Sequence, residues 1–207
     1  MFFTDKFDQK NFNQFQLSAK SGLIAGTSAA DVVFAWRWPG VAPDIQWITG
    51  IEVKGRTVSG FTSAQEVAVD LLPVSDFGGA NYTGGTDLSH PTTAANHAYI
   101  ARTTPYGLDT TQRASKFASG NVRIADTGAL SQGATPVIAS HPILWDAYAD
   151  LAAAATVQKG RFDARWTPPD GKAWGIGNDA GFVLQLPIGL GSGGTFRLFV
   201  SVFFAEG

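Results

Sequence analysis

The sequence predicts an all-β protein built as an antiparallel β-sandwich or jelly roll. Apolar and polar residues alternate over several segments, and this period of two is typical of half-buried strands. Asp outnumbers Glu by fourteen to three and the chain has 24 Gly, so turn-forming residues exceed those that favour helix surfaces. Charged residues make up 15% of the chain, against roughly 25% in average domains, so uncharged polar residues must cover much of the surface.

The 207 residues show no sharp change in composition, so we expect one sandwich domain over residues 31–207. Residues 1–30 are expected to form an N-terminal arm and a first strand, because apolar positions alternate there only at Phe15, Leu17 and Ala19. Residues 31–38 are apolar on both faces, which predicts a strand in the centre of a sheet.

The clearest alternation lies in residues 44–54 and predicts a half-buried strand. Its expected core face consists of Ile45, Trp47, Thr49, Ile51 and Val53. Ile48 falls on the opposite face, where we expect a neighbouring subunit to cover it together with Phe199 and Phe203. A third strand is expected near residues 67–71 and should end at Pro73, which has no N–H to donate.

Residues 74–121 are rich in Gly, Thr, Ala, Asn and Ser, and predict a long inserted loop region that is either functional or packed on a partner. Short strands follow at residues 122–124 and 137–138. Apolar residues at helical spacing then predict one short α-helix near 141–157, with Ser140 as its cap. The chain should finish with two alternating strands, 182–188 and 196–204, joined as a hairpin by GLGSGG.

Composition and charge argue against several functional classes. The net charge is −2 with no run of Lys or Arg, so we expect no nucleic-acid partner. The first residues lack the basic and apolar regions of a signal peptide, and no stretch of 18 apolar residues occurs, so we expect no membrane partner and synthesis in a cytoplasm. Without cysteine, neither disulfides nor thiolate metal sites can contribute to stability.

Motifs of catalytic chemistry are sparse, and we expect no enzyme, no cofactor and no metal site. Asp126-Thr127-Gly128 matches the triplet of aspartic proteases, which would have to act as a dimer, but it lacks the usual apolar lead-in and is also a common turn sequence. Gly189-x-Gly191-x-x-Gly194 precedes a strand instead of the helix that nucleotide binding requires. The three histidines form no pair at metal-binding spacing.

Aromatic residues are the better indication of function. Six Trp are present, and rings outside the core can bind a protein partner or stack on sugars. We expect the aromatic residues of the arm, the long loop and the late loops to contact a partner. These candidates are Phe2, Phe3, Phe7, Phe12, Tyr82, Trp166 and Trp174.

The order of segments resembles structural proteins of tailed-bacteriophage particles. The similarity is carried by VVFAWRW, the following long strand, TSAQEVAVDLLPVSDFGGANYTGGTDL, NVRIADTGAL and the terminal FRLFVSVFFAEG, over residues 30–207. The arm and the expected helix have no counterpart in that pattern. The resemblance implies a head decoration (cement) or fibre-anchoring protein of the virion that is assembled in the bacterial host cytoplasm.

Such a protein would act by binding. We expect it to form a homotrimer or another symmetric oligomer and to contact the major capsid protein or other virion proteins. The alternative from another class is a carbohydrate- or receptor-binding module of a tail fibre that uses Trp166 and Trp174. A dimeric aspartic protease that uses Asp126 is the remote alternative.

Overall fold

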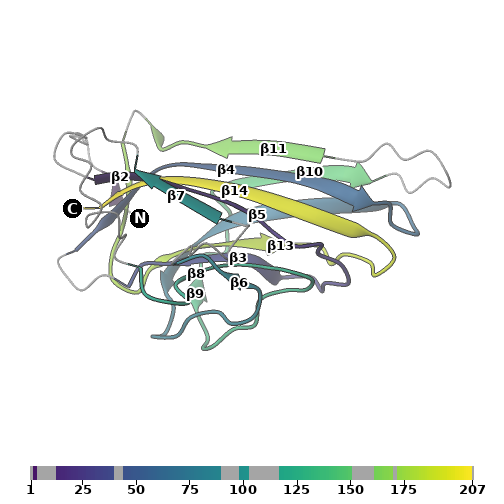
Figure 1. Ribbon diagram of the computed structural model, residues 1–207, viewed down its shortest axis with the longest axis horizontal. Coiled ribbons are helices and arrows are strands. Elements are labelled where there is room, and N and C mark those ends of the chain that lie inside the picture. The colour runs from purple at the N-terminus through teal and green to yellow at the C-terminus, as the bar shows by residue number, and fades with distance from the viewer. Residues whose placement is uncertain are drawn as a thin grey trace.

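The computed structural model describes residues 2–3, 13–39, 44–89, 98–102, 117–150, 161–169 and 172–206. Within these residues the protein consists of two antiparallel β-sheets packed face to face, which we call sheet A and sheet B (Figure 1). The predicted all-β sandwich is therefore confirmed. No helix in the described part of the chain has the length and apolar character needed to cross a membrane.

Sheet A has seven strands, in the spatial order β1-β12-β4-β14-β2-β7, with β11 also paired to β4. Their bounds are β1 Phe2–Phe3, β2 Asn13–Lys20, β4 Gln46–Ser59, β7 Ala98–Arg102, β11 Arg161–Trp166, β12 Trp174–Ile176 and β14 Thr195–Glu206. The expected strand around Phe15 to Ala19 is confirmed as β2, and the Phe15 ring stacks on Phe204 of β14. The two longest strands of this sheet, β4 and β14, pair with each other at its centre (Figure 1).

Sheet B also has seven strands, in the order β10-β5-β13-β3-β8-β6, with β9 paired to β5. Their bounds are β3 Asp31–Arg37, β5 Gln65–Asp76, β6 Thr86–Asp87, β8 Val122–Ile124, β9 Val137–Ile138, β10 Leu144–Asp150 and β13 Gly181–Leu186. Strand β3 lies between β13 and β8 and is buried on both faces, as its sequence predicted. The short strands β8 and β9 are confirmed.

An aromatic cluster joins the two sheets. Trp36 of β3 is fully buried, stacks on Phe182 at 5.6 Å between ring centroids, and meets Phe204 edge-on at 5.0 Å. Its Nε1 donates a hydrogen bond of 2.7 Å to Oε1 of Gln46, which is also fully buried. The amide of Gln46 in turn donates to Glu206, so a short polar chain runs through the apolar core from sheet B to sheet A.

A β-bulge in β4 corrects the expected core face of that strand. Phe203 of β14 pairs with Gly50 and Phe204 with Ile48, so Thr49 is the extra residue. A bulge shifts the alternation by one position. Ile48 therefore points into the core with 0% exposure while Trp47 is half-buried, and the expectation that a neighbouring subunit covers Ile48 was wrong.

The helix expected near 141–157 is wrong over its described part, where residues 144–150 form strand β10; residues 151–157 lie outside the described residues. All seven residues of β10 pair in register with β5, from Leu144 opposite Leu71 to Asp150 opposite Gln65. The sequence of β10 does not alternate cleanly as a strand, because Asp146 falls on the same inward side as Leu144, so it is the pairing along β5 that makes this segment a strand.

Pro73 does not end the third strand, because β5 continues to Asp76. The neighbour of β5 on this edge changes here, from β10 to β9. The carbonyl oxygen of Pro73 accepts a hydrogen bond of 2.8 Å from Ala139, between the two strands. A missing N–H is tolerated at such an interruption of the edge.

The expected C-terminal hairpin is also wrong. Strand β13 belongs to sheet B and pairs with β3 and β5, whereas β14 belongs to sheet A and pairs with β2 and β4. The glycine-rich segment 189–194 therefore crosses from one sheet to the other. Gly194 is packed so closely on Phe61 that a Cβ would lie 2.6 Å from its ring.

The described parts of region 74–121 contain ordered structure that packs on this chain. They include the end of β5, strand β6 and strand β7. Phe77 and Tyr82 belong to a second apolar cluster on the outer face of sheet B, and Leu88 and Phe117 belong to the main core. The loop residues are thus part of the fold, and they cover much of the outer face of β3 and β13.

Candidate functional site

The candidate site is one long side of the sandwich, where edge strands of both sheets meet. On this side β10 and β9 follow one another along β5 of sheet B, and β11 and β12 follow one another along β4 of sheet A. Strands β10 and β11 contact each other across the two sheets. We call this side the open edge, because the described residues place no further strand beside β9, β10 or β11.

A cleft of about 550 Å³ lies at the β9–β12 end of the open edge. Sheet B supplies Pro73–Ser75 and Val137–Ala139, and sheet A supplies Trp174–Ile176 and the turn that follows. Glycines line part of it, and a Cβ on Gly177 would meet no atom within 4 Å. A cleft of this size, with exposed backbone and a few polar side chains, can hold a short peptide segment or a small ligand.

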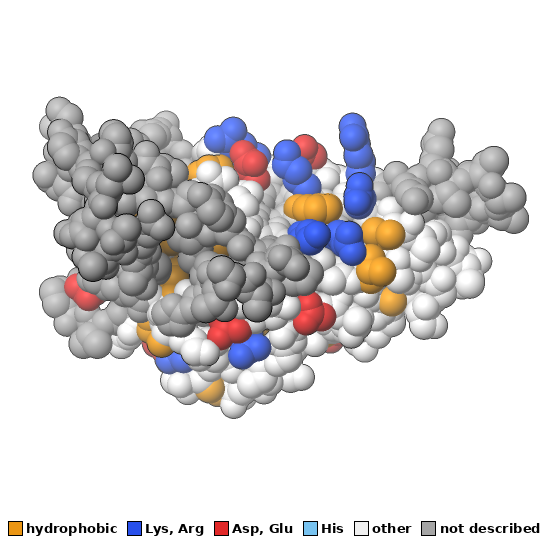
Figure 2. Space-filling model, in the orientation of Figure 1, with side chains coloured by type: hydrophobic (Ala, Val, Ile, Leu, Met, Phe, Trp, Pro, Cys, Tyr) orange, Lys and Arg blue, Asp and Glu red, His pale blue; other side chains and the backbone are white. Residues whose placement is uncertain are grey.

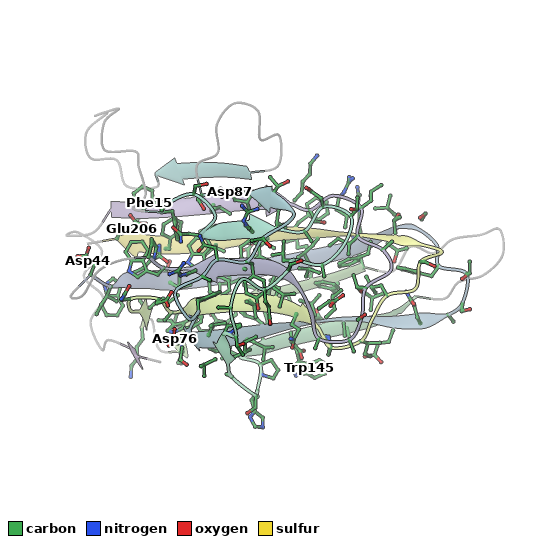
Figure 3. All side chains as sticks on the ribbon, turned by 90° about the horizontal axis from the view of Figure 1, so that it is seen from below. Phe15, Asp44, Asp76, Asp87, Trp145 and Glu206 are labelled. Carbon is green, nitrogen blue, oxygen red and sulfur yellow. The ribbon has the colours of Figure 1, made fainter. Side chains whose placement is uncertain are left out.

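Two large apolar side chains protrude from the sheet B half of the open edge. Trp145 of β10 is 69% exposed and Val137 of β9 is 59% exposed. Trp145 lies on the outer side of the molecule, well away from Phe15 and Glu206 at one end of the sandwich (Figure 3). Trp145 was not among the residues predicted to contact a partner, because its segment was expected to be a helix and nothing in a helical pattern distinguished this position.

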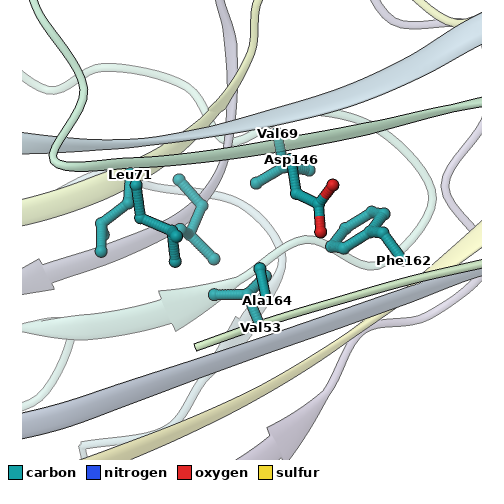
Figure 4. Close-up of a pocket in the computed structure, with 8 residues that line it drawn as sticks. Val53, Val69, Leu71, Asp146, Phe162 and Ala164 are labelled. Carbon is teal, nitrogen blue, oxygen red and sulfur yellow. The ribbon is translucent and has the colours of Figure 1, made fainter. Parts of the chain in front are cut away.

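Asp146, the residue after Trp145, points into the gap between the sheets (Figure 4). Its neighbours there are Val53, Val69, Leu71, Leu144, Phe162, Ala164 and Leu184, and the gap is too small for a water molecule. The carboxylate accepts a hydrogen bond of 2.8 Å from the N–H of Ala147. An inward-pointing charge on an edge strand discourages a second strand from adding to that edge.

The carboxylate of Asp70 lies on β5 directly opposite Trp145. Burial raises the pKa of Asp70 above its ordinary value. The outer side of this edge therefore combines a protruding indole with a carboxylate that is already partly desolvated. A partner that covers both must supply an apolar surface and a hydrogen-bond donor.

A polar network fastens the long loop region to the sandwich near the opposite edge of sheet B. Arg37 bonds to Asp179 and, at 2.8 Å, to Asn81. Burial alone would raise the pKa of Asp87, but hydrogen bonds from Ser89, Ser119 and Gly120 together outweigh it and hold that pKa below the ordinary value. The polar groups of this network are hydrogen-bonded to one another, so we assign the network a role in the fold and not in ligand binding.

The residues expected to contact a partner do not gather into one site. Phe2 and Phe3 form β1 on the edge of β12, while Phe7 and Phe12 lie outside the described residues. Tyr82 is 3% exposed and Trp174 is 4% exposed, so the expectation that Trp174 is an exposed ring was wrong and Tyr82 offers almost no surface either. Trp166 is partly buried against Trp174, with ring centroids 5.7 Å apart.

The Asp-Thr-Gly triplet lies in a loop that is bound to the chain's own N-terminal segment. Asp126 accepts a hydrogen bond of 2.9 Å from Thr86, and Ala25 donates to the carbonyl oxygen of Thr127. Among the described residues, no group of three or more His, Cys, Asp or Glu side chains is placed to hold a metal ion.

No protein-family model, curated protein or solved structure matches this chain. Function is therefore inferred from the surfaces described above.

Proposed function

We propose that this protein is a structural subunit of a tailed-bacteriophage particle, a head decoration (cement) or fibre-anchoring protein that acts by binding copies of itself and neighbouring virion proteins. The phage assignment rests on the resemblance of residues 30–207 to such proteins. The observation that carries the binding role is Trp145, which is 69% exposed on an edge strand. Large exposed rings of this kind are typical of the anchors of protein interfaces.

The direction of Trp145 determines how a neighbour would bind. Asp146 makes strand addition to β10 unfavourable, since a paired neighbour would confine its charge further. A neighbouring subunit is therefore expected to cover the outer side of the open edge with side chains, at Trp145, Val137 and Asp70. A homotrimer or another closed symmetric oligomer would bury this surface in every copy.

The oligomeric state of the purified chain tests the proposal. Multi-angle light scattering during gel filtration is expected to give a whole multiple of 21.9 kDa, and Trp145→Ser is expected to shift the protein toward the monomer. Leu23→Ser is the matched control, because Leu23 is also exposed, at 39%, but lies far from β10 in the sequence and on no edge strand. A wild-type monomer at all concentrations would contradict self-assembly.

The phage assignment needs a separate test. Mass spectrometry of purified particles from a host that carries the gene is expected to detect the chain at a fixed copy number per particle. Its absence from intact particles would refute the virion role and leave the self-association result unaffected.

The cleft supports a second candidate function, a carbohydrate- or receptor-binding module of a tail fibre. Trp174 and Asn178 line the cleft together with open glycine backbone. Glycan-array binding that is abolished by Asn178→Ala would favour this function. Asn178 is the better target than Trp174, whose loss would also damage the core.

A further inference from the structure

The outer face of sheet A carries a concentration of basic side chains. Its members come from four neighbouring strands and are Lys20, Lys54, Arg56, Arg161, Arg165 and Arg197. The same face carries two acidic side chains, Glu52 and Asp163, so its surplus is four positive charges. Because the whole chain carries −2, the remainder has a surplus of six negative charges. We call this surface the basic face; Figure 2 shows Lys and Arg side chains gathered there around hydrophobic ones.

Three arginines form a row across the sheet. In the register of the strands, Arg161 of β11 is directly opposite Arg56 of β4, and Arg56 is directly opposite Arg197 of β14. Adjacent strands are about 4.8 Å apart, so the row spans about 10 Å. Like charges placed directly opposite one another destabilise a sheet. The row therefore has a cost in the free protein that an anion lying across it would remove.

The acidic residues of this face do not neutralise the row. Asp163 pairs with Lys54 at 3.1 Å and Glu52 with Arg165 at 3.6 Å. In the described part of the chain no ion pair joins Arg56, Arg161 or Arg197 to a carboxylate. Guanidinium groups without partners are well suited to phosphate, which they bind through two parallel hydrogen bonds.

Aromatic rings lie among these charges. Phe199 and Phe203 are partly buried on the same outer face of β14, four residues and therefore about 13 Å apart. The guanidinium of Arg56 lies over the Phe199 ring, 5.6 Å from its centroid. A sheet surface that combines aromatic rings with basic side chains is the arrangement on which unpaired nucleobases stack while their phosphates meet Lys and Arg.

We infer that the basic face binds single-stranded nucleic acid. A single strand suits it better than a duplex, because only unpaired bases can stack on Phe203 and on the Arg56 guanidinium that lies over Phe199. We expected no nucleic-acid partner because the sequence has no run of Lys or Arg. The face instead assembles separate residues from β2, β4, β11 and β14, and this inference does not depend on the particle role.

Fluorescence anisotropy with a labelled oligothymidylate of about 15 nucleotides tests the inference on the full chain. Four unpaired positive charges predict a slope of log affinity against log salt of about −3. The double variant Arg56→Gln/Arg197→Gln is expected to weaken binding about tenfold and to reduce the slope by about 1.4. Arg123→Gln is the control, because it removes one arginine charge from β8 of sheet B, away from the basic face. It should change the affinity less than about twofold.

Two further measurements are needed. The first separates an effect on binding from an effect on folding, and the second separates recognition of bases from attraction to negative charge. Arg56→Gln should not lower the melting temperature, because it relieves repulsion in the row. Phe203→Ser should weaken binding of the single strand but leave binding of heparin, a polyanion without bases, unchanged. Equal affinity for the single strand, the duplex and heparin would overturn the assignment to single strands, and failure to bind the oligonucleotide at low salt would overturn the inference altogether.

Discussion

Replacing Asp146 with leucine should stabilise the fold, although it removes a charged residue from a strand near the surface. The Asp146 side chain is partly buried and lies beside apolar side chains of both sheets, at a narrow gap between them. Leucine has the same number of side-chain heavy atoms and branches at the same carbon, although its methyl groups are bulkier than carboxylate oxygens. The substitution therefore exchanges two oxygens for two methyl groups in surroundings that already suit methyl groups.

The magnitude follows from two opposing contributions. Removing a partly buried carboxylate from apolar contacts and adding apolar burial should contribute about 2 kcal/mol. Losing the hydrogen bond from Ala147, 2.8 Å long in the native protein, should cost about 1 kcal/mol. The expected gain in the free energy of unfolding is thus about 1 kcal/mol, or about 2–4 °C in melting temperature for a domain of this size.

Urea unfolding followed by tryptophan fluorescence measures this difference, with Asp146→Asn as the control that keeps the shape and the acceptor but removes the charge. Asn should give a smaller gain than Leu. Light scattering provides the second readout, since β10 without its inward charge should aggregate faster. A Leu variant that is less stable than the native protein would show that Asp146 is held by favourable interactions and would refute this reading of the gap.

Three further predictions concern the core and the two shifted carboxylates. Trp36→Phe should lower the free energy of unfolding by about 2–4 kcal/mol in urea titrations, because the buried Oε1 of Gln46 loses its donor and a cavity remains. Asp87→Asn should remove a stabilising contribution that depends on pH. Because the pKa of Asp87 is lowered in the folded protein, this contribution is complete above about pH 3.8 and is lost as the pH falls through the pKa of the folded state. Melting curves of both proteins at acidic pH will measure it. Asp70→Asn should raise the melting temperature at neutral pH, since the raised pKa of Asp70 makes its ionised form unfavourable in the fold, and native stability should itself rise as the pH falls through that value.

The sequence predicted the fold class because strands that are buried on one face show alternating apolar and polar residues. Strands β2, β3 and β14 were recognised from residues such as Leu17, Phe34 and Val200, which are all buried. Local patterns are sufficient where a strand alternates clearly, as β2 and β14 do, or is apolar on both faces, as β3 is.

Errors arose where a contact distant in the sequence changes the local pattern. Thr49 forms a bulge against Phe203 and Phe204, more than 150 positions later, and no local signal places it. Residues 144–150 have apolar residues at helical spacing, and it is the pairing with β5 that makes them a strand. The glycine-rich segment 189–194 was compatible with a hairpin, but β13 and β14 find their partners in different sheets.

The candidate surfaces were harder to predict than the fold, for the same reason. Trp145 owes its exposure to the outward side of an edge strand that was not expected. The basic face brings Lys20 and Arg197 together across the sheet, although they are far apart in the sequence. A run of charge can be counted in a sequence, whereas a row of charge across strands exists only once the register is known.

The two surfaces lie on different sheets, and this has a consequence for how they can work together. The basic face is the outer side of sheet A, while Trp145 and Asp70 lie on the outer side of sheet B. A ligand on one therefore need not exclude a partner on the other. If copies associate through Trp145, each adds a basic face to the assembly, and a long anionic strand could contact several of them at once. Under the mass action of such multivalent binding, even weak contacts per subunit would hold the strand firmly, so self-association should matter more for affinity than any single arginine.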